Sequence, residues 1–140
     1  MANLLFQGNS YEVCDDVRYA IELVTHTCGA TAGYASGHAV GARVVFVFPN
    51  GQEIQIAFNK RDLVIVLCDR SADGRSLSKL LPAKWIKKVY PRDGNAGQVL
   101  MSGKAKTLRP SATNPVLRLQ LRRDELHQTL ALYLGSAESC

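Results

Sequence analysis

The sequence lacks long apolar runs and any recognisable cysteine pattern, and each absence excludes a class of protein. Its longest apolar runs are six to eight residues, far short of the roughly 20 that a membrane-spanning helix needs. No charged segment followed by an apolar run opens the chain, so we expect no secretory signal. The four cysteines, Cys14, Cys28, Cys68 and Cys140, include no Cys-x-x-Cys pair. We therefore expect four reduced thiols and a cytoplasmic protein that does not contact membranes.

The composition shows no extreme either. Apolar residues make up 46% and charged residues 21% of the 140 positions, as in ordinary globular proteins. A chain of this length forms one domain and buries about 68% of its unfolded surface. Its core therefore needs neither a metal nor a disulfide.

The first residues are left out of the fold prediction. Residues 3–8, Asn-Leu-Leu-Phe-Gln-Gly, resemble viral-protease cleavage sites used in protein expression but match none of them completely. We therefore treat residues 1–8 as a flexible N-terminus or a cloning remnant. Residues 9–135 then form a single domain, and residues 136–140 form a C-terminal tail.

Basic charge is concentrated in one stretch of the chain. Residues 1–59 hold two basic and five acidic side chains, a net charge of −3. Residues 60–123 hold fifteen basic and four acidic side chains, a net charge of +11, and residues 124–140 hold three acidic ones only. If the fold gathers these cations on one face, that surface attracts anions. Nucleic acid is the commonest large anion that such a surface meets.

Residues 9–28 show the spacing of an amphipathic helix, with apolar residues on one face and charged residues on the other. Asn9 and Glu12 have the spacing of a capping box, and Gly29 is typical of a helix C-terminus. Residues 30–41 are rich in glycine, alanine and serine and predict a loop.

The clearest local signal is a β-hairpin over residues 43–58. Two runs of β-branched and aromatic residues flank Asn50-Gly51, the strongest two-residue turn signal. Residues 63–68 are apolar throughout, which predicts a third and central strand. The two-residue turn sets a register that buries four apolar side chains on one face of the hairpin. The expected pairs are Val47 with Ile54 and Val45 with Ile56.

The second half of the chain is less regular. Residues 76–90 predict a helix that is broken at Pro82, and residues 98–101 form a possible short strand. Residues 116–122 alternate cleanly between leucine and polar residues and predict a strand. Asp124 caps a final helix. The element order of helix, three-strand meander, helix, strand and helix defines an α+β domain.

The best candidate site is formed by cations of the basic stretch. Several cations at the spacing of a phosphate backbone bind nucleic acid, and the neighbouring Trp85 and Tyr90 could add base stacking. The alternative is a solvated helix face whose Trp85 belongs to the core, and the helical stripe of apolar residues at Trp85 favours the core. Arg109 and Arg123 extend the basic set. The candidate nucleic-acid-binding residues are Lys84, Lys87, Lys88, Arg92, Lys104, Lys106, Arg118 and Arg122.

The element order also permits a comparison with restriction-endonuclease-like nucleases, at the level of fold alone. Such enzymes need two acids and usually a lysine near the hairpin strands to hold a divalent metal. The acids to examine are Glu53, Asp62 and Asp69. The strand at 43–48 contains no acid, however, and the segment after Asp62 lacks the lysine.

Two further patterns have plainer explanations. His26 and His38 could serve Cys28 as a base or a metal site, but His26 and Cys28 point to different faces of a helix. The glycines at every fourth position of residues 29–41 follow a helix and precede a strand, the reverse of phosphate-binding loops. We therefore expect a core cysteine, and a connector whose glycines give flexibility or close packing.

The sequence thus predicts a small, non-enzymatic α+β protein that binds an acidic partner, with nucleic acid as the leading candidate. The second candidate is an interaction or inhibitor module for an acidic protein surface, and the third is a metal-dependent nuclease. We expect no metal or other cofactor. Exposed stacking aromatics would favour nucleic acid, an exposed apolar patch a protein partner, and clustered carboxylates an enzyme.

Overall fold

The computed structural model describes residues 2–6, 8–36, 43–94 and 106–135. Helices and strands are mixed along these ranges, and two short segments, the π-turn η1 and the 3₁₀ turn η2, adjoin regular elements. The elements are β1 (Ala2–Phe6), β2 (Asn9–Val13), α1 (Asp15–Glu22), η1 (Leu23–Thr27), β3 (Thr31–Ser36), β4 (Arg43–Val47), β5 (Glu53–Ala57), β6 (Leu63–Cys68), α2 (Leu77–Leu80), η2 (Ala83–Trp85), β7 (Ile86–Tyr90), β8 (Val116–Leu121) and α3 (Arg123–Leu134).

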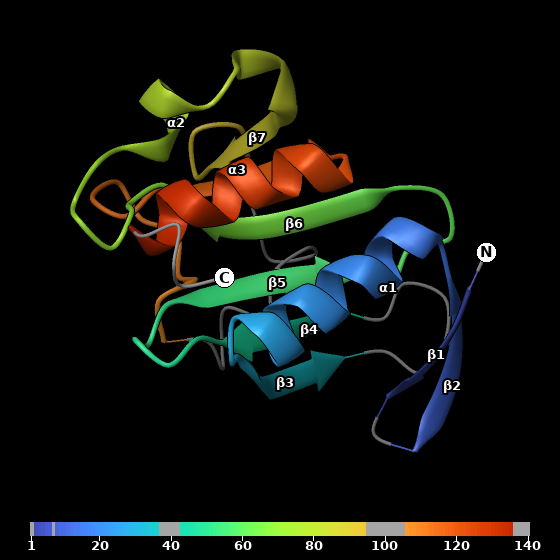
Figure 1. Ribbon diagram of the computed structural model, residues 1–140. Coiled ribbons are helices and arrows are strands. Elements are labelled where there is room, and N and C mark those ends of the chain that lie inside the picture. The colour runs from blue at the N-terminus through green and yellow to red at the C-terminus, as the bar shows by residue number, and fades with distance from the viewer. Residues whose placement is uncertain (1, 7, 37–42, 95–105, 136–140) are drawn as a thin grey trace.

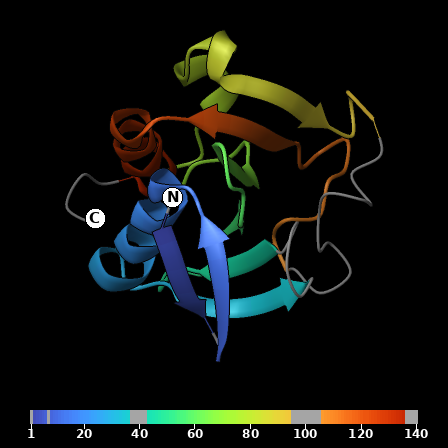
Figure 2. The same ribbon diagram turned by 90° about the vertical axis from the view of Figure 1, so that its right-hand side faces the viewer.

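The strands form two antiparallel sheets. β1 and β2 pair as a separate hairpin, and the other strands form a six-stranded sheet in the order β3-β4-β5-β6-β8-β7. Helices α1 and α3 lie next to each other on one face of this sheet (Figure 1, Figure 2). The architecture is one compact α+β domain, as the sequence predicts, and β6 is an interior strand. Within the described ranges, no helix combines the length and apolarity that crossing a membrane requires.

Alternate residues of the large sheet point to two faces, here named the helix face and the distal face. The helix face packs against α1 and α3. At its margin, the ring of Phe48 meets Tyr133 of α3 edge-on, with 6.3 Å between ring centroids. Burial of each such side chain contributes about 1.5–3 kcal/mol, so this layer supplies much of the stability. Its fully buried members include Phe46, Ile54, Ile56, Leu63, Ile65, Leu67, Leu117 and Leu119.

The β4–β5 hairpin is present, as predicted, but its loop is one residue longer than expected. The N–H of Phe48 donates to the carbonyl of Gln52 at 2.8 Å, and the N–H of Gly51 donates to the carbonyl of Phe48 at 2.9 Å. Pro49 therefore belongs to the turn. Gly51 has a φ of +91°, and such three-residue loops with a left-handed last residue are the next most common hairpin connection.

The longer loop moves the register by one residue, so that Val47 pairs with Glu53. The prediction that Val45, Val47, Ile54 and Ile56 share one face is therefore wrong. A one-residue slip exchanges the faces of one strand relative to its neighbour. Ile54 and Ile56 face the helices, whereas Val45, Val47 and Glu53 lie on the distal face.

The N-terminus also differs from the prediction. β1 lies within residues 1–8, which were left out of the fold, and β2 occupies residues 9–13, which were assigned to the helix. The aromatic rings of this hairpin explain its place, because Phe6 and Tyr11 both pack edge-on against Phe58, with centroids 5.6 and 4.8 Å from it. The helix therefore begins at Asp15, and the predicted capping box at residues 9–12 is wrong.

Two other segments form strands where the sequence predicts a loop or a helix. β3 occupies half of the predicted loop, since it pairs with β4 along the sheet edge. In the predicted helix 76–90, α2 ends before Pro82 and β7 follows η2 as the opposite edge strand. Sheet pairing with β8 overrides the weak helical pattern there. The possible strand at 98–101 lies outside the described residues.

The last strand and helix follow the prediction more closely. β8 buries Leu117, Leu119 and Leu121 as expected. The helix α3 begins one residue before Asp124, and the N-cap is Arg122, whose N–H donates to the carboxylate of Glu125 at 2.9 Å. The predicted cap at Asp124 is therefore wrong by two positions.

The cysteines do not all carry free thiols. Cys14 and Cys68 are free, whereas Cys28 is disulfide-bonded; Cys140 lies outside the described residues. The prediction of four reduced thiols is therefore wrong at Cys28. The absence of a Cys-x-x-Cys pair does not exclude a disulfide that tertiary structure creates between cysteines distant in the chain.

Candidate nucleic-acid interface

Two cations of different strands stand side by side on the distal face. Lys88 of β7 is the register partner of Arg118 of β8. Side chains of such partners have Cβ atoms about 4.5–5.5 Å apart, and like charges in this position repel each other. Lys88 is exposed and Arg118 is partly buried. An anion between them would remove the repulsion.

Arg118 also lines a pocket of about 420 Å³ at the end of the distal face. The turn between β5 and β6 forms one wall, and β6 forms the floor. The guanidinium of Arg118 makes no hydrogen bond or ion pair with any described residue, although it carries five donors. The lining residues are Phe58, Asn59, Lys60, Arg61, Asp62, Val64 and Arg118.

The polar residues of the pocket are only partly engaged. Lys60 lies 3.6 Å from Glu12 of β2 in an exposed ion pair, which contributes little. The amide of Asn59 donates to Asp62 at 3.1 Å. Arg61 is exposed and has no ion pair with a described residue. The pocket therefore holds three cations against one carboxylate.

The remaining predicted site residues are scattered. Arg92 pairs with Asp93 at 3.0 Å, and this arginine and the N–H of Val89 hold the pKa of Asp93 below its usual range. Arg122 contacts Glu125 at 3.5 Å. Lys84, Lys87 and Lys106 are exposed without an ion pair to a described residue, and Lys104 lies outside the described residues. Of the predicted set, the structure thus brings Lys88 and Arg118 together.

The aromatic residues of the predicted set belong to the core. Trp85 has 7% and Tyr90 4% of its surface exposed, so neither ring is a platform for base stacking. This outcome agrees with the core alternative for Trp85, although the residue lies in a 3₁₀ turn and not on the predicted helix.

Sequence reasoning missed Lys60 and Arg61 as site residues. The signal was present, because both lie in the basic stretch, between the predicted strands that end at residue 58 and begin at residue 63. Their proximity to Arg118, which is 57 positions after Arg61, depends on the pairing of β6 with β8. The alternating polarity of residues 116–122 predicts on which side of the strand Arg118 lies, but not which residues of other elements lie beside it.

The acids proposed for a nuclease are not gathered in one place. Asp62 and Asp69 flank β6 at opposite ends, about 23 Å apart at 3.3 Å per residue. Asp69 accepts hydrogen bonds from Ser76 and Ser78. Among the described residues, no three histidine, cysteine or acidic side chains could hold a metal together.

Glu53 has a structural role. Its side chain is 1% exposed, and its Oε1 accepts hydrogen bonds from the N–H groups of Lys106, Thr107 and Leu108 and from the Thr107 hydroxyl. The thiol of Cys68 donates to the Thr107 carbonyl at 3.0 Å, and burial raises the pKa of this thiol. These bonds fasten the segment that precedes β8 across the distal face, on the side away from the pocket.

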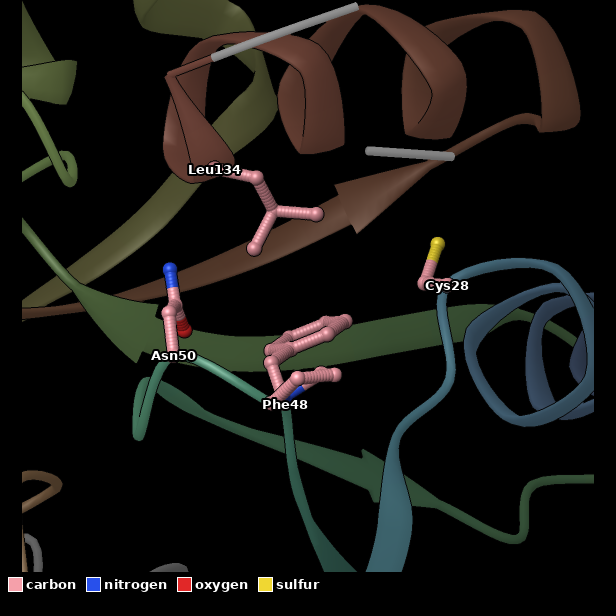
Figure 3. Close-up of a pocket in the computed structure, with 5 residues that line it drawn as sticks. Cys28, Phe48, Asn50 and Leu134 are labelled. Atoms are coloured by element: carbon pink, nitrogen blue, oxygen red, sulfur yellow. The ribbon is translucent and has the colours of Figure 1, made fainter. Parts of the chain in front are cut away.

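A second, smaller pocket of about 220 Å³ lies between the β4–β5 turn, Cys28 and the C-terminal end of α3 (Figure 3). Cys28, Phe48 and Leu134 give it an apolar lining. The Cys28 sulfur is in a disulfide and so is not a nucleophile, and His38 lies outside the described residues. Gly33 lies within β3, where an added Cβ would be 3.2 Å from Val47 Cγ2, so close packing is the reason for this glycine.

The chain has no match among protein-family models, curated proteins or solved structures. Its function is therefore inferred from the geometry alone.

Proposed function

We propose that the protein is a non-enzymatic binding protein for nucleic acid, held by the cations around the distal-face pocket. The observation that supports this most directly is Arg118, a partly buried guanidinium that has no partner among the described residues and lies beside a second cation, Lys88. Partial burial of an unpaired charge costs free energy. Two phosphate oxygens offset that cost with bidentate hydrogen bonds, and Lys60 and Arg61 extend the positive surface along the rim.

An acidic protein surface is the alternative partner. A protein interface is normally anchored by large apolar or aromatic side chains. Across the described ranges, the exposed large apolar residues are Leu5 and Leu80, and neither lines the pocket. The surroundings of Arg118 therefore favour phosphate groups over a protein surface.

A cytoplasmic location is part of this proposal. The free thiols of Cys14 and Cys68 agree with a reducing compartment, whereas a disulfide at Cys28 is more typical of an oxidising one. The location stays a prediction.

The experiment is a salt titration of binding to a fluorescently labelled DNA duplex, read by anisotropy. Replacement of Arg61, Lys88 and Arg118 by alanine should reduce the slope of log K against log salt by about 2.7, or 0.9 for each lost phosphate contact. The affinity at low salt should fall with it.

The matched control removes three arginines from the other side of the molecule. Arg18 of α1, Arg123 of α3 and Arg75, whose loop contacts the C-terminal end of α3, are each in an exposed ion pair. Their replacement by alanine changes the net charge equally and should leave the slope within about 0.5 of the original, because these residues meet no phosphate. Equal effects of the two triple variants, or no binding by the original protein at low salt, would refute the proposal.

A further inference from the structure

The distal-face pocket combines three kinds of surface, and a phosphate backbone alone requires only the positively charged one. Arg118, Lys60 and Arg61 supply positive charge on its sides. Val64, half-buried on β6, and the edge of Phe58 supply an apolar floor. Asn59 and Asp62 supply amide and carboxylate groups at the rim.

Each surface matches one part of a nucleotide. A guanidinium binds phosphate oxygens in pairs, and an apolar floor accepts the face of a planar ring. One oxygen of Asp62 accepts the Asn59 amide, which leaves the other to accept a hydrogen bond from a sugar hydroxyl or a base amino group. The volume of about 420 Å³ is within the range of about 300–1,000 Å³ that is usual for small-ligand sites.

We infer that this pocket binds a single nucleotide through its phosphate and its base or sugar. The nucleotide can be free or can form the end of a strand, since both present the same chemistry. The inference rests on the proposed nucleic-acid binding where the nucleotide is a strand end, and it stands without that proposal where the nucleotide is free. A continuous backbone, by contrast, would contact the cations but not the apolar floor.

Isothermal titration with three small ligands tests the pocket directly. A nucleoside 5′-monophosphate should bind at least about tenfold more tightly than inorganic phosphate or the unphosphorylated nucleoside, because only the nucleotide uses both the charged and the apolar surfaces. Arg118→Gln should weaken nucleotide binding by about 10- to 100-fold, as expected for a hydrogen-bonded charge. Arg75→Gln is the control and should have no effect.

A cavity-filling variant distinguishes binding inside the pocket from binding to the rim cations. Val64→Phe places a larger side chain on the pocket floor and leaves all the cations in place. It should abolish nucleotide binding and preserve the salt-dependent binding of a blunt duplex without terminal phosphates. Its thermal unfolding should remain cooperative, and Val64→Ile, which adds one methylene, serves as a milder second variant that should weaken nucleotide binding less.

Strand ends distinguish the two sources of the nucleotide. Single strands with a 5′-phosphate, a 3′-phosphate or neither are compared with the free nucleotide. Preference for one phosphorylated end identifies a strand end as the ligand, and tight binding of the free nucleotide alone identifies a small-molecule site.

Equal affinity for all three strands together with no binding of the free nucleotide would overturn the inference but leave the proposed function intact. Nucleotide binding no tighter than that of inorganic phosphate, or unchanged by Val64→Phe, would overturn it as well. Failure of the duplex to bind in the salt titration would instead overturn the proposed function.

Discussion

The two faces of the six-stranded sheet are built from alternate residues of the same strands, yet they differ in cover and in charge. The helix face is apolar and is covered by α1 and α3, which carry five acidic and two basic side chains. The distal face carries Arg118 and Lys88 and is fastened near Glu53 to the segment that precedes β8. The helix face thus packs against helices, whereas the distal face combines buried residues such as Glu53 and Val45 with the exposed Lys88 and the partly buried Arg118.

The largest effect that we expect concerns Trp85. Trp85→Ala should cost about 3–5 kcal/mol in the free energy of unfolding, because the indole is 7% exposed and its removal leaves a cavity. Urea unfolding followed by circular dichroism measures this cost. If stability were unchanged and single-strand binding fell instead, the ring would belong to the binding surface and not to the core.

Neighbouring residues of β8 allow a direct comparison of the faces. Leu119→Ala, on the helix face, should cost about 2–5 kcal/mol because Leu119 is fully buried. Arg118→Ala, one position earlier on the distal face, removes a partly buried charge that has no partner among the described residues and should not lower stability. Urea unfolding of both variants, with duplex binding measured in parallel, should show stability lost in the first and affinity lost in the second. The reverse pattern would contradict the assignment of the faces.

A substitution of Glu53, in the covered part of the distal face, should have a smaller effect on the free energy of unfolding. Glu53→Gln removes the charge from a buried oxygen that accepts three backbone N–H groups and a hydroxyl. We expect a loss of about 1–3 kcal/mol in the free energy of unfolding. Glu22→Gln, which alters an exposed acid on α1, is the matched control and should be nearly neutral. Equal effects would show that the segment before β8 is held by other contacts.

The smallest effects that we expect are differences in alkylation rate between the cysteines. Burial raises the pKa of Cys68, so less of it is thiolate at pH 8 and its alkylation should be slower than that of the half-buried Cys14. Cys28 should react only after reduction, because it is in a disulfide. Mass spectrometry of protein alkylated without reductant follows all three. Modification of Cys28 in an acid-quenched cell extract would show that the disulfide does not form in the cell.

Most of the strands that are strongly marked in the sequence have neighbours close along the chain. β4, β5 and β6 were predicted because they form a meander with short turns, and β8 was predicted from its alternating leucines. The edge strands β3 and β7 were missed. Their sequences carry glycine or lysine, and they become strands because β4 and β8 offer them hydrogen-bonding partners.

The candidate site likewise contains residues that the sequence predicts and residues that only the fold brings together. The charge segregation pointed to cations within residues 60–123, and Lys88 and Arg118 belong to that set. The helix on which Lys84, Lys87 and Lys88 were expected to line up does not form, so these lysines share no helical face. Lys60 and Arg61 enter the site through their position in a turn that strand pairing brings to Arg118.

The sequence by itself determined the fold class, the central strands, the burial of the leucines of β8 and the concentration of positive charge, because these depend on local periodicity and composition. Only the tertiary structure decided the hairpin register, the edge strands, the state of Cys28 and the meeting of Arg118 with the turn at residues 59–62. The edge strands, the state of Cys28 and the position of Arg118 depend on contacts between residues distant in the chain, whereas the register depends on the length of one turn. A change of one residue in a turn is enough to exchange the faces of a strand.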